Sequence, residues 1–342
     1  METPALLLSS RIVSDTPIQD FDIVVVDGRP LVVCADFHGE KVFTWDPADD
    51  RWVEHPLDNP FGPDEMEGDC LLEIGAVVLD GRIVVGGGGY RQPFAQWDLE
   101  TGAVRTYIRD EHGGLAKTST MALDGRSLFV CGDSSVPARV RLWDASQRDS
   151  LIEDEEIDHL ADPIELYGHF DSIGGLGSGT LGGRSVVISG GVDGRVMVWD
   201  IHDKDPVVQF ERAPFAVMGV GLATVDGRSR VVAAGGESVM LGDPGTGAWD
   251  EPIGVSGDED QDDEGIECMD VGVVDGRPIA VTGAKDGTVC VWDLAGRRLL
   301  GEPFTEHERE VFAVRITALG GRTVALTAGR DRRMRVWSLG GR

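Results

Sequence analysis

A seven-fold internal repeat constrains this sequence more than any other feature. A turn tripeptide, Asp-Gly-Arg or Gly-Gly-Arg, recurs along the chain, and a second landmark, usually Trp-Asp, follows each copy by 16 to 19 residues. The tripeptides begin at Asp27, Asp80, Asp124, Gly182, Asp226, Asp275 and Gly320. The landmarks begin at Trp45, Trp97, Trp143, Trp199, Gly242, Trp292 and Trp337. Such self-similarity indicates copies of one small unit that pack on one another, rather than unrelated domains.

Each copy reads as four short antiparallel strands. Apolar runs on both sides of Asp27-Gly28 predict a hairpin, because Asp and Gly tolerate the positive φ angles of a tight turn. A second turn, such as Asp193-Gly194, precedes the strand that ends at Trp199. A lone sheet with two apolar faces cannot bury both, so the copies must pack face to face, and a ring leaves no sheet exposed. We therefore predict an all-β propeller of seven blades with four antiparallel strands each.

These landmarks resemble those of the WD-repeat family of β-propellers over roughly residues 5 to 342. The family pattern implies a buried, hydrogen-bonded tetrad made of a His before strand one, a Ser or Thr on strand two, an Asp in the next turn and the Trp. By position, two copies complete this structural tetrad: His169, Ser189, Asp193 and Trp199, and His307, Thr327, Asp331 and Trp337. The sixth copy has Thr282 and Asp286 but carries Asp262 at the His position, and the fifth copy lacks the Trp at Gly242.

The resemblance also implies how the last blade is completed. The seventh copy reaches only its third strand at Trp337, and the apolar stretch 5–13 has no partner in its own copy. We expect this N-terminal strand to complete the last blade, which removes a free sheet edge. Residues 1–342 would then form a single domain and a monomeric ring. The expected blades are 14–60, 61–110, 111–162, 163–212, 213–257, 258–306, and 307–342 plus 4–13.

The charge balance narrows the range of partners. The chain carries 31 Lys and Arg against 60 Asp and Glu, a net charge of −29. Nucleic acids and anionic membrane surfaces are bound through clustered basic residues, so we predict neither as a partner. No apolar run reaches the roughly 18 residues of a membrane-spanning helix, and no secretory signal is visible at the N-terminus.

Cysteine usage predicts a reducing compartment. Five cysteines are an odd number and contain no Cys-x-x-Cys pair, which argues against a disulfide framework or a structural zinc site. They are Cys34, Cys70, Cys131, Cys268 and Cys290. We expect free thiols and a cytoplasmic protein. Four Lys against 27 Arg indicate a GC-rich coding bias, which is typical of a bacterial source.

Three connections between copies are longer than the others, and all three are acidic. Their acidic residues are Asp64, Glu65, Glu67 and Asp69; Glu153, Asp154, Glu155, Glu156 and Asp158; and Asp258, Glu259, Asp260, Asp262, Asp263 and Glu264. The resemblance implies that these connections leave on the top face, near Lys285, Arg330, Arg332 and Arg333. Two interpretations stay open: solvated loops, or a negative field that attracts a basic protein segment, a polyamine or a metal ion.

Motifs for chemistry are sparse. Residues 177–182 match G-x-G-x-x-G but lead into a strand, so no helix N-terminus would face a pyrophosphate. The run from Asp258 begins like a calcium loop, yet Asp263 stands where the sharp turn needs Gly, and Met269 where the bidentate Glu belongs. The seven histidines are dispersed along the chain, and no two of them have the spacing of metal ligands on one strand. We therefore predict no cofactor, no metal site and no catalytic residue.

The predicted function is a non-catalytic scaffold whose acidic top face docks a partner protein or a basic peptide. The alternative is an enzyme of lyase, isomerase or hydrolase type, with or without a metal, whose active site lies in the central funnel. In WD-repeat relatives, residues just after the tetrad His and just before the turn Asp surround the top opening. The resemblance carries this role to Phe170, Ser172, Val192, Asp263, Lys285, Glu308, Glu310 and Arg330. Phe170 is the expected apolar anchor, while the charges steer association.

Overall fold

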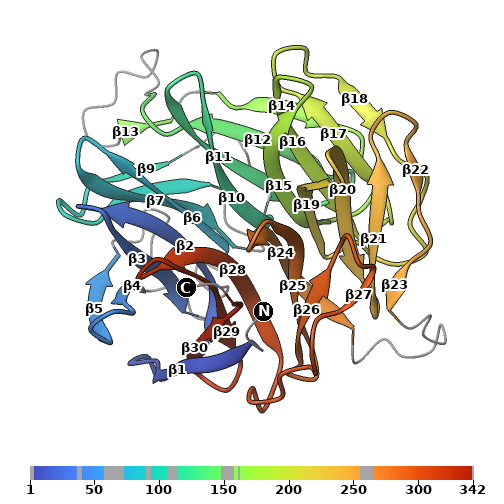
Figure 1. Cartoon of the computed structure of the whole chain (residues 1–342). Helices are drawn as coiled ribbons and strands as arrows, with labels where there is room; N and C mark the ends of the chain where they lie inside the picture. The colour runs from blue at the N-terminus through green and yellow to red at the C-terminus, as the bar shows by residue number, and fades with distance from the viewer. Residues whose placement is uncertain are drawn as a thin grey trace. The chain divides into compact units, whose positions relative to one another are not determined.

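Every regular element among the described residues is a β-strand (Figure 1). The structure is a computed structural model that describes residues 4–36, 41–57, 73–89, 94–106, 114–147, 158–160, 162–254 and 265–340. The chain divides into two compact units, Gln19–Ile173, and Met1–Ile18 with Gly174–Arg342, which we describe one at a time. In the described part of the chain, no helix has the length and apolar character that a membrane crossing needs.

The unit of residues 19–173 contains three sheets, which we number as blades one to three. Blade one consists of β2 (Ile18–Val26), β3 (Arg29–Asp36), β4 (Lys41–Asp46) and β5 (Arg51–Pro56). Blade two consists of β6 (Glu73–Leu79), β7 (Arg82–Gly88), β8 (Ala95–Asp98) and β9 (Val104–Thr106), with β13 (Asp158–His159) added at its edge. Blade three consists of β10 (Leu115–Leu123), β11 (Arg126–Asp133), β12 (Arg139–Asp144) and β14 (Ile164–Tyr167).

The other unit contains blades four to seven. Blade four consists of β15 (Ile173–Leu181), β16 (Arg184–Gly191), β17 (Val196–Asp200) and β18 (Pro206–Gln209). Blade five consists of β19 (Gly219–Val225), β20 (Arg228–Gly235), β21 (Ser238–Asp243) and a split outer strand, β22 (Ala248–Trp249) and β23 (Ile253–Gly254). Blade six consists of β24 (Ile266–Val274), β25 (Arg277–Ala284), β26 (Val289–Asp293) and β27 (Arg298–Leu299). Blade seven consists of β28 (Val311–Leu319), β29 (Arg322–Gly329), β30 (Arg333–Ser338) and β1 (Ala5–Arg11).

Two-residue turns with positive φ join the first two strands of every blade. Asp27 and Gly28 have φ angles of 50° and 75°, and all seven tripeptides repeat this pair of positive angles. Such a turn matches the twist of the strands that it joins, and Asp-Gly is a preferred sequence for it. We call this end of a blade its lower end, and the end where strand two turns into strand three its upper end.

The N-terminal strand completes the last blade. β1 pairs antiparallel with β30, from Ala5 opposite Ser338 to Arg11 opposite Arg333. Figure 1 shows the blue strand β1 beside the red strand β30. The predicted fold class is therefore confirmed: an all-β propeller of seven blades, each with four antiparallel strands, and an N-terminal strand in the last blade.

The third blade differs from the sequence-based expectation in one respect. We expected the acidic stretch 153–158 to connect strand four of one blade with strand one of the next, at the upper end. Instead, it lies in the connection from β12 to β14, which pair antiparallel, with Leu142 opposite Ile164. This connection therefore leaves and rejoins the sheet at the lower end. The four-residue strand β14 also belongs to blade three, not to the blade expected from residue 163 onward.

The same connection also reinforces blade two. β13 pairs in parallel with β9, with Asp158 opposite Arg105 and His159 opposite Thr106. Leu160 follows, donates its backbone N–H to the Thr106 carbonyl at 3.0 Å, and is buried in an apolar cluster shared by blades two and three. An exposed strand edge is a site for unwanted pairing, and β13 covers the edge of the three-residue strand β9.

The Asp that ends strand three in blades one to six shapes the turn that follows it. Asp98 Oδ1 accepts backbone N–H groups from Glu100 and Thr101, both at 3.0 Å, and Asp243 Oδ1 accepts that of Gly245 at 2.8 Å. A side chain that bonds its own backbone two residues on is the usual stabiliser of such a turn. The Arg of the tripeptide is the second partner in several blades, with Arg82 Nη1 2.7 Å from Asp98 Oδ2. The repeat spacing thus brings the two landmarks together.

The core lies between successive blades of each unit. In the unit of residues 19–173, one apolar cluster joins blades one and two and includes Trp97, and another joins blades two and three and includes Trp143. In the other unit, Trp292 packs in a cluster with blade five, and Trp337 in a cluster with blade six. The Trp of strand three therefore faces the preceding blade in each of these cases.

Carboxylates on two innermost strands accept hydrogen bonds from the next blade. Asp22 Oδ2 accepts the backbone N–H of Ala76 at 2.9 Å, and Asp270 Oδ2 accepts that of Ile316 at 2.6 Å. Asp22 and Asp270 both stand five residues before the Asp-Gly turn of their blade. These bonds satisfy backbone donors that would otherwise be buried without partners.

Removing residues 1–13 should destabilise the protein, because it leaves β30 as an open edge and deletes Ile12, which is 4% exposed. We expect the unfolding temperature to fall by at least about 5 °C. Differential scanning calorimetry checks this, with removal of residues 1–3 alone as the control. An unchanged unfolding temperature would contradict a structural role for β1.

Candidate functional site

A hydrogen-bonded cluster fixes the upper end of blade seven. The Trp337 indole N–H donates to Thr327 Oγ1 at 2.8 Å, and His307 Nε2 lies 2.8 Å from the same oxygen. On its other side, His307 Nδ1 lies 3.1 Å from Asp331 Oδ1. All four residues that the WD-repeat resemblance implied as a tetrad are thus in contact. They anchor the segment before β28 to the turn between β29 and β30.

A buried arginine extends this cluster. Arg335 Nη1 donates to Asp331 Oδ2 at 2.7 Å and lies 2.6 Å from His307 Nδ1, and its other terminal nitrogen donates to the Glu306 carbonyl at 2.6 Å. The side chains of Arg335 and Asp331 are each only 5% exposed. A buried ion pair of this kind tolerates the loss of one partner poorly, because the remaining charge is left unpaired.

Burial and the neighbouring groups together set the charge state of the cluster. Burial is the main cause that lowers the pKa of His307 below 6.5, and Arg335 lowers it further, although Asp331 opposes this. Burial raises the pKa of Asp331, but the hydrogen bond and charge of His307, together with Arg335, outweigh it and lower that pKa to about 2. At neutral pH the cluster therefore contains a neutral imidazole, a carboxylate and a guanidinium.

Blades four and six contain parts of the same arrangement. The Trp199 indole N–H donates to Ser189 Oγ at 2.8 Å, and that of Trp292 donates to Thr282 Oγ1 at 2.9 Å. Asp193 Oδ1 accepts the backbone N–H of Arg195 at 3.1 Å. His169, the fourth residue implied for blade four, belongs to the unit of residues 19–173, where it is buried. Asp262, at the His position of blade six, lies outside the described residues.

Sequence reasoning missed a second buried arginine, in blade three. Arg141 is 1% exposed, donates through Nε to Asp133 Oδ1 at 2.8 Å, and lies 5.4 Å from the centre of the Trp143 ring. Arg139 Nε donates to the other carboxylate oxygen of Asp133 at 2.9 Å. Arg141 and Arg335 both stand two residues before the Trp of their blade. An Arg at an inward position of an otherwise apolar strand was the available signal.

The predicted binding residues of blades six and seven lie at upper ends, and their cations are paired. Arg330 Nη1 lies 3.3 Å from Glu310 Oε2, and Lys285 Nζ lies 3.2 Å from Glu267 Oε1. Glu308 is exposed, and its backbone N–H donates to Asp331 Oδ2 at 3.4 Å. Val192, in the upper turn of blade four, is 41% exposed.

The predicted anchor follows β14 at the upper end of blade three, where β14 and the loop between β11 and β12 carry two other exposed apolar side chains. Phe170 is 61% exposed, as is Tyr167, and Val136 is 69% exposed. Ser172 Oγ donates to the Ser134 carbonyl at 2.9 Å, which ties the segment after β14 to the loop between β11 and β12. We call Val136, Tyr167 and Phe170 the blade-three patch.

Some predicted features lie outside the described residues. These are Asp263 and nearly all of the acidic residues of the three long connections. Within the described ranges, no group of three or more His, Cys, Asp or Glu side chains is arranged to hold a metal ion.

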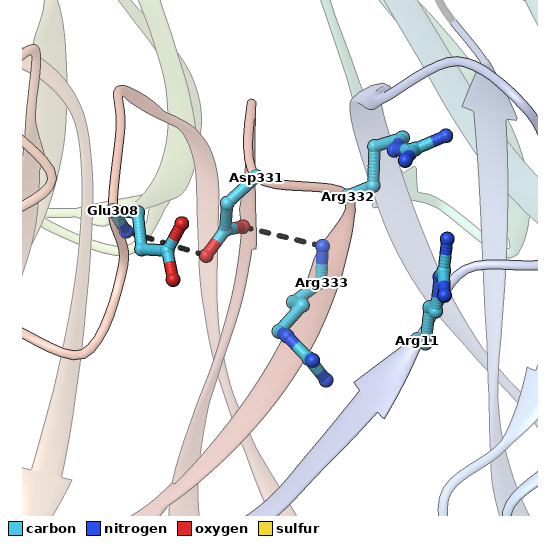
Figure 2. A pocket seen from close by; sticks show the side chains of 5 residues that line it. All are labelled: Arg11, Glu308, Asp331, Arg332 and Arg333. Atoms are coloured by element: carbon cyan, nitrogen blue, oxygen red, sulfur yellow. Dashed lines mark hydrogen bonds between the residues drawn. The ribbon is translucent and has the colours of Figure 1, made fainter.

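A hollow of about 150 Å³ opens beside the blade-seven cluster (Figure 2). It is lined by Arg11 from β1, Glu308, and Asp331, Arg332 and Arg333 from the end of the β29–β30 turn. Figure 2 shows Glu308 and Asp331 on one side of the view and Arg11 and Arg332 on the other. In this view the hollow has an acidic side and a basic side, with Arg333 between them.

The architecture defines the class of protein as a seven-bladed β-propeller. The family model of the WD domain, G-beta repeat, matches residues 259–293, a stretch that contains β24, β25 and β26 of blade six. This match and the seven blades together support a WD-repeat β-propeller. Propellers of this family commonly act as protein-interaction scaffolds. A comparison with curated proteins finds no match.

Acid should weaken the blade-seven cluster in two steps. Because the folded-state pKa of His307 lies below 6.5, its stabilising contribution is present above pH 6.5 and falls as the pH drops through the folded-state value. The contribution of Asp331 is present above its ordinary pKa of 3.8 and is lost as the pH falls towards 2. Asp331→Asn should therefore lower stability at pH 7 and flatten the pH profile below pH 4. Urea unfolding across pH checks this, and parallel profiles for both proteins would contradict it.

The Trp337 indole should contribute both packing and a hydrogen bond. We expect Trp337→Ala to cost about 3–5 kcal/mol of unfolding free energy. Trp337→Phe, which keeps a ring but removes the donor to Thr327, should cost about 1–3 kcal/mol. Denaturant unfolding measures both, with Trp52→Ala on the outer strand β5 as a control that should cost less. Equal costs for the two Trp337 variants would rule out the contribution of the hydrogen bond.

Proposed function

We propose that the protein is a non-catalytic binding platform that docks a basic protein segment with an apolar residue on the upper end of blade three. The observation that carries this proposal is the blade-three patch. Exposed apolar side chains that occur singly are ordinary on a protein surface, whereas a group of them with a polar rim is typical of an interaction site. Two of its three members are aromatic, and aromatic anchors dominate the energy of many interfaces.

The rigidity of the patch supports the proposal. Tyr167 stands opposite Arg139 in the β12–β14 pairing, so its backbone is held by the sheet. Phe170 follows within three residues, and the bond from Ser172 to the Ser134 carbonyl holds its segment against the loop that carries Val136. Anchors that are already positioned lose less conformational entropy when a partner binds.

The charge around the patch favours a basic partner. Glu165 Oε1 is 3.0 Å from Arg139, and its other oxygen accepts the Tyr167 hydroxyl. Asp171 stands directly beside Phe170 in the chain, and the protein as a whole carries a net charge of −29. A field of this sign accelerates the encounter with a cationic segment and repels acidic competitors. Lys285 and Arg330 are each paired with a carboxylate, so we give them no role in this docking.

We place this activity in a reducing compartment such as the cytoplasm. The described cysteines are Cys34, Cys131, Cys268 and Cys290, all free thiols. Burial raises the pKa of Cys131 to about 12 and that of Cys290 to about 11, so neither thiol is ionised at neutral pH. Cysteines that are free rather than in disulfides are typical of reducing compartments.

Replacing the anchor should shorten the lifetime of the complex. A peptide array of Lys- and Arg-rich segments, each with one aliphatic or aromatic residue, supplies the ligand. For the best binder we expect Phe170→Ala and Tyr167→Ala to raise the dissociation rate by about tenfold or more, the range for a hot-spot residue. Asp171→Asn should instead slow association and reduce its salt dependence. Surface plasmon resonance measures both rates.

The matched control is Val207→Ala, because Val207 is an exposed apolar residue (47%) on the outer strand β18 of blade four. It should leave both rates unchanged. An array with no binder, or a binder whose rates do not change in the Phe170 and Tyr167 variants, would overturn the proposal for this surface.

A further inference from the structure

We infer that the hollow beside the blade-seven cluster is a binding site for a phosphoryl group, a tetrahedral dianion borne by a small molecule or a modified side chain. The site is built from residues of one unit, and it is independent of the blade-three patch. Three guanidinium groups, those of Arg11, Arg332 and Arg333, line a hollow of about 150 Å³. Guanidinium groups bind phosphate oxygens through paired, charge-assisted hydrogen bonds.

The positions of two of these arginines are unfavourable without an anion. Arg11 on β1 stands directly opposite Arg333 on β30. Like charges directly opposite on paired strands repel each other and destabilise the pair. Among the described residues, neither guanidinium forms an ion pair with a carboxylate, in a chain that has 60 acidic residues. A bound dianion would turn this repulsion into attraction.

Arg332 has a backbone conformation that glycine adopts at the equivalent position of two other blades. The residue after the turn Asp is Gly194 in blade four and Gly287 in blade six, with φ angles of 75° and 91°. Arg332 follows Asp331 in the same way and has a φ of 61°. A non-glycine residue with positive φ is uncommon and is often held in place at a functional site. The backbone conformation of this turn therefore does not itself require an arginine.

The acidic residues of the hollow do not neutralise its basic side. The Asp331 carboxylate is engaged by Arg335, at 2.7 Å, and by His307, at 3.1 Å. Glu308 lies on the opposite side of the view from Arg11 and Arg332 in Figure 2. The Arg332 guanidinium donates to the Asp15 carbonyl at 3.1 Å, which leaves further donors of its five for an anion. Glu308 would oppose the anion moderately and so set the affinity.

A phosphoryl ligand would join the two ends of the described chain. Arg11 comes from β1, whereas Arg332 and Arg333 come from the turn into β30 and its first residue. The ligand would therefore strengthen the pairing that completes blade seven. A ligand that binds only the folded state raises the unfolding temperature by mass action.

Inorganic phosphate is the probe for the first test. We expect sodium phosphate to raise the unfolding temperature above that in sodium chloride of equal ionic strength and pH, with saturation, and to broaden the ³¹P signal of phosphate. Arg11→Ala and Arg333→Ala should each weaken the affinity by about tenfold, which corresponds to about 1.4 kcal/mol. Arg228→Ala, which removes an exposed arginine of the lower turn of blade five, is the control and should leave it unchanged.

Two further variants separate binding from folding. Arg332→Gly restores the residue found at the equivalent turns, so it should keep or raise the unfolding temperature without phosphate while it abolishes the increase caused by phosphate. Glu308→Gln removes the opposing carboxylate and should tighten phosphate binding. No purely structural role of these residues predicts both results.

The source of the phosphoryl group is decided by a comparison of ligands. A basic peptide with one phosphoserine and its unphosphorylated form are titrated beside inorganic phosphate. Tighter binding of the phosphopeptide identifies a modified protein as the source, and equal affinities identify a small phosphate. If phosphate acts no differently from chloride at equal ionic strength, or if the arginine variants respond as the control does, the inference is wrong.

Discussion

Burial of side chains between successive blades is the interaction on which the rest of this structure depends. Each blade is a sheet whose two faces are apolar, and no blade can hide both faces by itself. The Trp97, Trp143, Trp292 and Trp337 side chains all lie in clusters shared with the preceding blade. These clusters hold the strands of each blade in place. The upper turns and the segments before strand one lie at the upper ends of those strands. Both candidate sites are therefore positioned by the core, although neither belongs to it.

Much of the fold could be predicted because local chemistry determines it. Asp27-Gly28 and its counterparts form the expected turns, since few other residue pairs accept two successive positive φ angles. The N-terminal strand could be assigned to the last blade for two reasons. The seventh copy lacks a fourth strand, and the apolar stretch before the first copy has no partner there. The contact of Trp337 with Thr327 could be anticipated from the family resemblance, because both residues stand at its tetrad positions.

Other features depend on which residues are neighbours in space, and a repeat pattern does not give that information. Arg141 and Arg335 are buried charges, and only the proximity of Asp133 and Asp331 makes their burial tolerable. The four-residue strand β14 is too short to be told from the start of the next blade, so the blade boundary expected at residue 163 puts β14 in the wrong blade. The hollow at Arg332 also escaped notice, because a residue's φ angle cannot be read from its type.

The pairing of β1 with β30 has a consequence for how the chain is made. β1 precedes the blades in the chain and β30 follows all but one of their strands, so β1 must wait for its partner until the blades between them have been translated. Until then, Leu6 and Leu7 belong to an unpaired apolar strand, which is a template for association with other chains. Closing a contact between such distant segments is also entropically slow. The strand that completes the last blade is thus exposed to misassembly while the blades are being synthesised.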